Sequence, residues 1–134
     1  MSRKHPGLGA LAAALALLAA GPSSAWEPPQ PMTQNGQFVM RDGEAIYKNV
    51  CTTCHMADAK GATGAGTYPS LAGNRRLTAA AYPIMVVVRG QKGMPPFGPV
   101  LDDEQVAAVV TYVRTHFGNS YAKPVTAAEV KALR

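Results

Sequence analysis

Two cysteines and a histidine lie within five residues of one another in the segment Cys51-Thr-Thr-Cys54-His55, and the chain has no other cysteine. Two thiols and an imidazole at this spacing have four ordinary uses in proteins. They form a disulfide, bind zinc, exchange thiols for disulfides, or hold a haem through two thioether bonds with the histidine beneath the iron. Each use makes its own demands on the rest of the chain, so the other residues discriminate between them.

Three of the four interpretations do not fit the rest of the chain. A disulfide across two intervening residues closes a very short loop and constrains the unfolded chain little. Zinc needs further ligands, but the other histidines are His5, near the N-terminus, and the distant His116. A thioredoxin-like pair normally accompanies a βαβ pattern, which is absent here. The segment therefore predicts one covalently attached haem c, bound through Cys51 and Cys54 with His55 as an axial ligand.

The second axial face of a haem iron needs its own ligand or stays open. Downstream of His55 the candidates are Met56, Met85, Met94 and His116. Met56 adjoins the proximal histidine and cannot reach the opposite face, and Met85 lies in an apolar run where methionine usually fills a core or packs on the haem. Met94 lies in GQKGMPPFG, where glycines permit close backbone approach and prolines stiffen the loop. Met94 is the predicted distal ligand.

The elements that position these groups are predicted to be helical. Residues 42–50 form a helix that leads into the attachment segment, and residues 78–89 form a second one. The glycine-rich residues 61–74 are predicted as a loop. A short helix begins at Thr126, in a tail over residues 119–134 that docks either on a partner or on the protein's own surface. No stretch alternates enough to predict a strand. We therefore expect a small all-α domain whose core is completed by its haem.

The clearest element covers residues 102–117. Asp102 can cap it, Gln105 lies at the capping-box position and Gly118 ends it. One apolar stripe follows the helical period, formed by Val106, Val109, Val110, Val113 and Phe117.

The first 25 residues have the pattern of a secretory signal peptide, with a basic start, an apolar run over residues 7–20 and small residues ending at Ala25. The run is too short to span a bilayer. We expect residues 1–25 to be removed on export to the periplasm, and residues 26–134 to form the mature domain with its short tail and no transmembrane segment. The formal net charge of +5 falls to a mild +3 without Arg3 and Lys4, and no basic stripe with interleaved aromatics suggests nucleic acid.

These features together resemble the class I cytochrome c family, over nearly all of the chain from residue 26 to about Gly118. In that family a glycine on the first helix and an aromatic residue one turn later lie where the last helix crosses. Gly43 and Tyr47 occupy those positions, and Tyr112 is the matching aromatic on the last helix.

Two loops extend this resemblance. YPSLAG looks like the family's loop in which a backbone carbonyl accepts the Nδ1–H of the proximal histidine, which implies Pro69 as the partner of His55. MPPFG looks like the family's methionine loop, which implies Met94 as a ligand of the iron.

A narrower resemblance concerns the electron donor. YPSLAGN, GQKGMPPFG and LDDEQVAAVVTYVRTHFGN are similar to cytochrome subunits that serve periplasmic dehydrogenases, including 4-alkylphenol-oxidising flavoenzymes and membrane-associated alcohol dehydrogenases. The resemblance implies a periplasmic monohaem carrier, not an enzyme. It would take single electrons from a dehydrogenase, with a flavoenzyme favoured, and pass them by outer-sphere transfer to an oxidase or another cytochrome. The alternative is a peroxidase-like haem enzyme with an open distal site, which requires that Met94 does not bind the iron.

Overall fold

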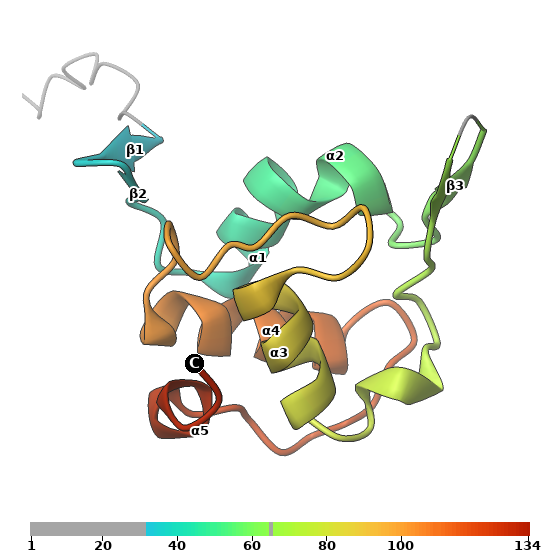
Figure 1. Cartoon of the computed structure of the whole chain (residues 1–134). Coiled ribbons are helices and arrows are strands. Elements are labelled where there is room, and N and C mark those ends of the chain that lie inside the picture. The colour runs from blue at the N-terminus through green and yellow to red at the C-terminus, as the bar shows by residue number, and fades with distance from the viewer. Residues whose placement is uncertain (1–31, 65) are drawn as a thin grey trace, which may run out of the picture.

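The computed structural model describes residues 32–64 and 66–134 of the chain. The predicted signal peptide, residues 1–25, lies outside the described residues, as do the first residues of the predicted mature domain. Every helix in the described part is too short or too polar to make a bilayer crossing. The arrangement of the elements is shown in Figure 1.

The attachment segment lies at the end of one continuous helical stretch. The stretch consists of α1 (Gly43–Ile46), the π-helical turn η1 (Tyr47–Cys51) and α2 (Thr52–His55). Asp42 caps its first turn, because its side chain accepts a hydrogen bond of 2.9 Å from the backbone N–H of Ala45. The prediction of a helix that leads into the attachment segment is confirmed, and the helical backbone continues to His55.

Two small hairpins correct the expectation that the chain contains no strand. The strands are β1 (Thr33–Gln34) paired with β2 (Gln37–Phe38), and β3 (Ala62–Thr63) paired with β4 (Thr67–Tyr68), both antiparallel. Each strand has two residues, so no alternation can develop along it. The informative signal was Asn35-Gly36, whose φ angles of 52° and 76° suit the tight turns of hairpins. Figure 1 shows the β3 hairpin extending away from the helices.

The helix before the methionine loop is shorter than predicted. The expected helix over residues 78–89 is realised as α3 (Ala81–Arg89), and a separate 3₁₀ turn, η2 (Arg75–Leu77), precedes it. Gly90 ends α3 with a φ of 71°. A Cβ atom at Gly90 would lie 2.6 Å from the carbonyl oxygen of Met94, so the loop closes this tightly only on glycine.

The long helix predicted over residues 102–117 is confirmed as α4 (Asp103–Thr115). Asp102 and Gln105 form the predicted capping box, with Gln105 N–H donating to Asp102 and the Asp102 N–H donating back, each at 2.9 Å. The valines of its predicted stripe are buried, and Phe117 is half-buried. The helix ends two residues earlier than expected, because His116 is already extended and Phe117 has a φ of 58°.

Helices α1 and α4 cross in close contact at Gly43. A Cβ atom there would lie 2.3 Å from the carbonyl oxygen of Ala108, which is backbone of α4. One turn later Tyr47, 1% exposed, packs its ring 5.7 Å from that of Tyr112 and 4.8 Å from that of Phe117. The positions that the family resemblance assigned to Gly43, Tyr47 and Tyr112 are therefore the positions at which the two helices meet.

The tail docks on the protein's own surface. It ends in the helix α5 (Ala127–Lys131), capped by a box in which Thr126 and Glu129 bond each other's backbone N–H groups. Val130 is fully buried, and α5 packs against α4 and α3. Figure 1 shows α5 below these two helices.

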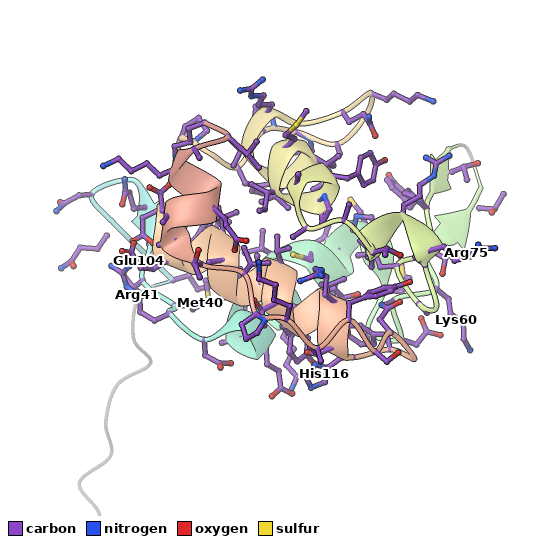
Figure 2. The ribbon with its side chains drawn as sticks, turned by 90° about the horizontal axis from the view of Figure 1, so that it is seen from below. Met40, Arg41, Lys60, Arg75, Glu104 and His116 are labelled. Atoms are coloured by element: carbon purple, nitrogen blue, oxygen red, sulfur yellow. The ribbon has the colours of Figure 1, made fainter. Side chains whose placement is uncertain are left out.

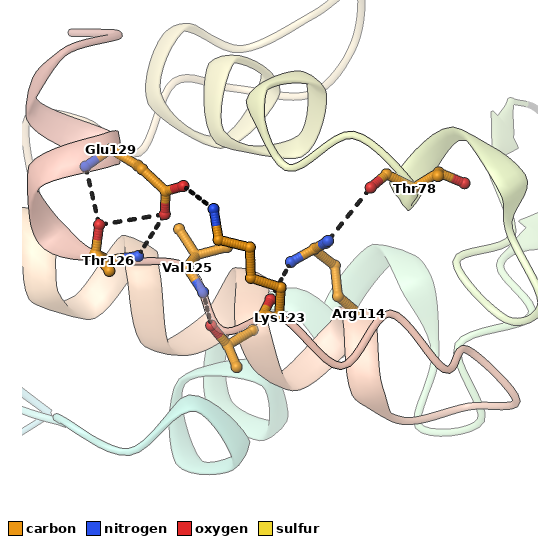
Figure 3. A network of polar contacts seen from close by, with 7 residues as sticks. Thr78, Arg114, Lys123, Val125, Thr126 and Glu129 are labelled. Atoms are coloured by element: carbon orange, nitrogen blue, oxygen red, sulfur yellow. Dashed lines mark hydrogen bonds and ion pairs between the residues drawn. The ribbon is translucent and has the colours of Figure 1, made fainter.

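A buried arginine joins the tail to the helical body. The Arg114 guanidinium, 5% exposed, donates to the backbone carbonyls of Leu77 at 3.0 Å, Lys123 at 2.6 Å and Thr78 at 3.3 Å. Figure 3 shows the last two of these contacts beside the Thr126 capping box. Because one side chain serves carbonyls before α3 and after α4, it holds both connecting segments on α4.

Arg114→Met is expected to lower the free energy of unfolding by about 2–4 kcal/mol, because carbonyls left without a donor in a buried site each cost roughly 1–3 kcal/mol. Urea denaturation of the haem-loaded protein, followed by circular dichroism, measures this loss. The control is Arg76→Met, at an exposed arginine, which should change stability by less than about 0.5 kcal/mol. Equal losses in the two variants would contradict the role of Arg114.

Candidate functional site

The imidazole of His55 is held in one orientation. His55 is 7% exposed, and its Nδ1 lies 3.0 Å from the carbonyl oxygen of Pro69. A carbonyl oxygen can only accept, so Nδ1 carries a hydrogen. This contact leaves Nε2 as the ring nitrogen that can bind a metal. This is the geometry that the predicted pairing of His55 with Pro69 requires.

A tight loop brings Pro69 back to His55. The backbone N–H of Gly61 donates to the His55 carbonyl at 3.1 Å, and those of Leu71 and Ala72 donate to the Ala59 carbonyl at 2.7 and 3.0 Å. Gly61 has a φ of 70°, and a Cβ atom there would lie 2.1 Å from the carbonyl oxygen of Tyr68. The close approach of these two backbone segments depends on glycine at position 61.

The two thiols share a helical face with the imidazole. Cys51, Cys54 and His55 stand at positions i, i+3 and i+4 of a continuous helical backbone, and residues at this spacing lie on one side of a helix. The π-helical turn η1 ends at Cys51, the first residue of this face, and π-helical turns are frequent at functional sites. One planar group could therefore meet all three side chains from the same side.

The thiols are free and half-buried. Burial, with a smaller contribution from the neighbouring Cys54, raises the pKa of the Cys51 thiol to about 12. Cys51 is thus a protonated thiol at neutral pH, whereas redox-active pairs work through a thiolate. Within residues 32–64 and 66–134, no three His, Cys, Asp or Glu side chains gather closely enough to hold a metal ion.

Met94 lies half-buried in a loop fixed at both ends. On one side, the backbones of Gln91 and Met94 exchange two hydrogen bonds of 3.0 Å. On the other side, the N–H groups of Phe97 and Gly98 donate to carbonyls of α3 at 2.9 and 3.1 Å. The loop then returns past α1 to the start of α4 (Figure 1). A methionine between two anchors has little freedom to lose when its thioether binds, which suits it to ligation.

Large apolar side chains remain uncovered beside these groups. Met85 on α3 is 41% exposed, and Tyr68, next to Pro69, is 45% exposed. This exposure shows that Met85 does not pack in a protein core, and packing on the haem stays a prediction. These side chains form a donor set that fits haem c. It consists of two thiols, the Nε2 nitrogen of an imidazole and a thioether, and the exposed apolar side chains could cover the ring.

His116 is not part of this donor set. It is exposed, its ring stacks 4.1 Å from that of Tyr112, and its Nδ1 lies 2.9 Å from the Tyr112 carbonyl oxygen. An exposed position just after α4 suits a surface role for this histidine.

Sequence reasoning missed one group of contacts near the methionine loop. The Arg134 guanidinium donates to the carbonyl of Gly98 at 2.7 Å and to that of Leu101 at 2.6 Å. No local signal marks such a contact, because the partners lie more than thirty residues apart in the chain.

The chain is similar to a family of known proteins over more than half of its length. The family model described as cytochrome c oxidase, cbb3-type, subunit III matches residues 39–113. The chain is 35% identical over 113 residues to cytochrome c-552 of Thermus thermophilus, covering 69% of this chain and 84% of that protein.

Two dehydrogenase subunits are also similar. The chain is 39% identical over 109 residues to the fructose dehydrogenase cytochrome subunit of Gluconobacter japonicus. It is 33% identical over 104 residues to the gluconate 2-dehydrogenase cytochrome c subunit of Pantoea cypripedii. Each alignment covers 69% of this chain but only 22% and 24% of the respective subunit, so the chain spans about a quarter of their length.

Proposed function

The chain belongs to the cytochrome c family, and on this premise we propose that it is a periplasmic electron carrier with one haem c. Cys51 and Cys54 tether the group, and His55 and Met94 are its axial ligands. When bound, haem c supplies an iron that gains and loses one electron. The observation that carries the proposal is the shared helical face of the two thiols and the imidazole, with His55 Nδ1 held by the Pro69 carbonyl.

Each of these residues has a distinct task. The two thioether tethers prevent loss of the group after export. The Pro69 carbonyl keeps the proton of His55 on Nδ1 and fixes the ring, which raises its basicity as a ligand. Met94, held between its two anchors, closes the distal side. With His55 and Met94 both bound to the iron, no position would remain for oxygen or peroxide, so the group would supply one-electron transfer alone.

The electron donor is proposed to be a periplasmic dehydrogenase, with a flavoenzyme favoured, and the acceptor an oxidase or another cytochrome. Support comes from two of the relatives, which are cytochrome subunits of fructose and gluconate dehydrogenases. The exposed side chains of Lys60 and Arg75 lie on one side of the molecule, opposite Arg41 and Glu104 (Figure 2). Basic groups on the side that also carries the β3 hairpin would attract an acidic partner surface.

Haem staining of a denaturing gel tests the attachment. After expression with haem-attachment machinery, the wild-type chain should keep its colour, and a Cys51→Ala, Cys54→Ala double variant should lose it, because no thioether bond remains. Thr53→Ala, at an exposed position inside the same segment, should keep its colour. A wild-type chain without colour would overturn the proposal.

Gentle size exclusion of a periplasmic extract from the native host tests the partner. Haem that elutes together with flavin, at a mass far above the chain's 14.0 kDa, supports a dedicated subunit of a flavoenzyme. Haem that elutes alone near that mass contradicts a stable complex and leaves a diffusible carrier.

A further inference from the structure

The C-terminal residues are tied to the segment that carries Met94. At the end of α3, the Arg89 guanidinium donates to the carbonyls of Leu133 and Arg134 at 2.8 and 3.0 Å. Arg134 in turn donates to the carbonyls of Gly98 and Leu101 and pairs with Asp103 at the start of α4. Arg89 and Arg134 therefore connect three segments of the chain, which are α3, the end of the methionine loop and the beginning of α4.

Gly98 is the position at which these contacts meet the loop. Its N–H donates to the Val88 carbonyl at 3.1 Å, and its own carbonyl accepts from Arg134 at 2.7 Å. A Cβ atom at Gly98 would lie 2.7 Å from the Val88 oxygen and 3.1 Å from the Arg134 guanidinium. The backbone N–H and the carbonyl of Gly98 are therefore both hydrogen-bonded, at a position four residues after Met94. Because Gly98 has no side chain, its backbone lies directly against α3 and Arg134.

The segment that presents Arg134 is itself firmly anchored. Val130 of α5 is fully buried, and α5 packs on α4. The carboxylate of Glu129 closes the capping box with Thr126 and pairs with Lys123 at 3.1 Å (Figure 3). Arg134 is thus presented from a fixed support.

We propose that Arg134 is a positioning residue for Met94, which keeps the methionine loop closed over the distal side of the haem. This inference rests on the proposed role of Met94 as distal ligand. Arginine suits the task because its planar fork has several donors in fixed directions, so one side chain serves Gly98, Leu101 and Asp103 together. A lysine could retain the ion pair with Asp103 but could not hold both carbonyls.

Cyanide binding to the haem-loaded ferric protein tests this inference, because cyanide reaches the iron only after the loop opens. Arg134→Ala should bind cyanide about tenfold faster than wild type, which corresponds to about 1.4 kcal/mol in the opening equilibrium. It should also lose the sulfur-to-iron absorption band at a lower pH. Arg134→Lys should fall between the two, and Arg89→Gln should shift both readouts in the same direction.

Two controls separate positioning from general loss of stability. Lys131→Ala, at an exposed position at the end of α5, should bind cyanide at the wild-type rate. Asn119→Ala removes bonds of 2.8 Å to the carbonyls of Leu71 and Val113 and should lower stability without a comparable rise in rate. A wild-type rate in Arg134→Ala, or an equal rise in Asn119→Ala, would overturn the inference.

The Met94→Ala variant separates a failure of this inference from a failure of the proposed function. If Met94→Ala and wild type bind cyanide at the same rate, Met94 is not the ligand, and the proposed function and this inference both fail. If Met94→Ala is fast and Arg134→Ala matches wild type, only the role of Arg134 fails.

Discussion

Met94→Ala is expected to raise the apparent affinity for cyanide in the ferric state, and for carbon monoxide in the ferrous state, by about 10- to 1,000-fold. In the wild type these ligands bind only to the minor population with an open loop, which in such equilibria is roughly 0.1–10%. The apparent affinity is reduced by that fraction. Removing the thioether makes the open form the whole population. The reduction potential should fall as well, because methionine ligation raises it.

The loop itself should survive this substitution. The bonds between Gln91 and Met94 are made by backbone atoms, as are those from Phe97 and Gly98 to α3, so alanine at position 94 keeps the anchors. Titration with cyanide and carbon monoxide, together with a potentiometric titration, measures both effects.

Met85→Ala is the matched control for this prediction. Met85 lies on α3, outside the anchored loop that carries Met94, so its loss should leave that loop closed and external ligands as poorly bound as in wild type. Wild-type protein that takes up cyanide as readily as Met94→Ala would remove Met94 from the ligand set. The haem enzyme with an open distal face would then be the better interpretation.

Gly43→Ala is expected to destabilise the protein by about 1–3 kcal/mol, and Gly43→Val by more. The added Cβ would meet the Ala108 oxygen at 2.3 Å, the Ala108 carbonyl carbon at 2.7 Å and the Tyr112 Cβ at 3.0 Å. Two of these atoms are backbone of α4, which cannot turn aside as a flexible side chain can. Overpacking of this kind costs roughly 1–3 kcal/mol, occasionally more, and the better helix propensity of alanine offsets about 1 kcal/mol at most.

The effect should reach the haem site, because α1 runs directly through η1 into Cys51. Urea denaturation of the haem-loaded protein, followed by circular dichroism, measures the loss. The control is Gly64→Ala, where a Cβ atom would meet nothing within 4 Å and the change should stay under about 0.5 kcal/mol. Equal stability of Gly43→Ala and wild type would show that α1 and α4 do not cross as closely as described.

Features that depend on neighbours a few residues apart were predictable from the sequence. The capping boxes of α4 and α5 join residues three apart, and the valine stripe of α4 follows the helical period. The spacing of Cys51, Cys54 and His55 is likewise local. The hairpins could not be predicted from an alternating pattern, because strands of two residues are too short to carry one.

Features that join distant segments were decided by the tertiary structure. Gln105 shows the difference within one residue. Its place in the capping box was evident from the sequence, but its Nε2 also donates to the carbonyls of Phe38 and Met40 at 2.6 and 2.7 Å. That pairing arises only when α4 packs against the segment before α1, and it lets a fully buried amide satisfy its donors.

The same distinction applies to the candidate site. Local spacing determined which residues can hold a haem, since two thiols and an imidazole must share one helical face. Packing decided how those residues are held. The group that holds His55 is a backbone carbonyl, and every residue has one, so residue type does not show which carbonyl is used. The Pro69 carbonyl beside His55 followed only from the family resemblance, and the Gly98 carbonyl beside Arg134, 36 residues away in the chain, had no signal in the sequence at all. A backbone acceptor has no residue-specific mark, so only the folded chain shows which one is used.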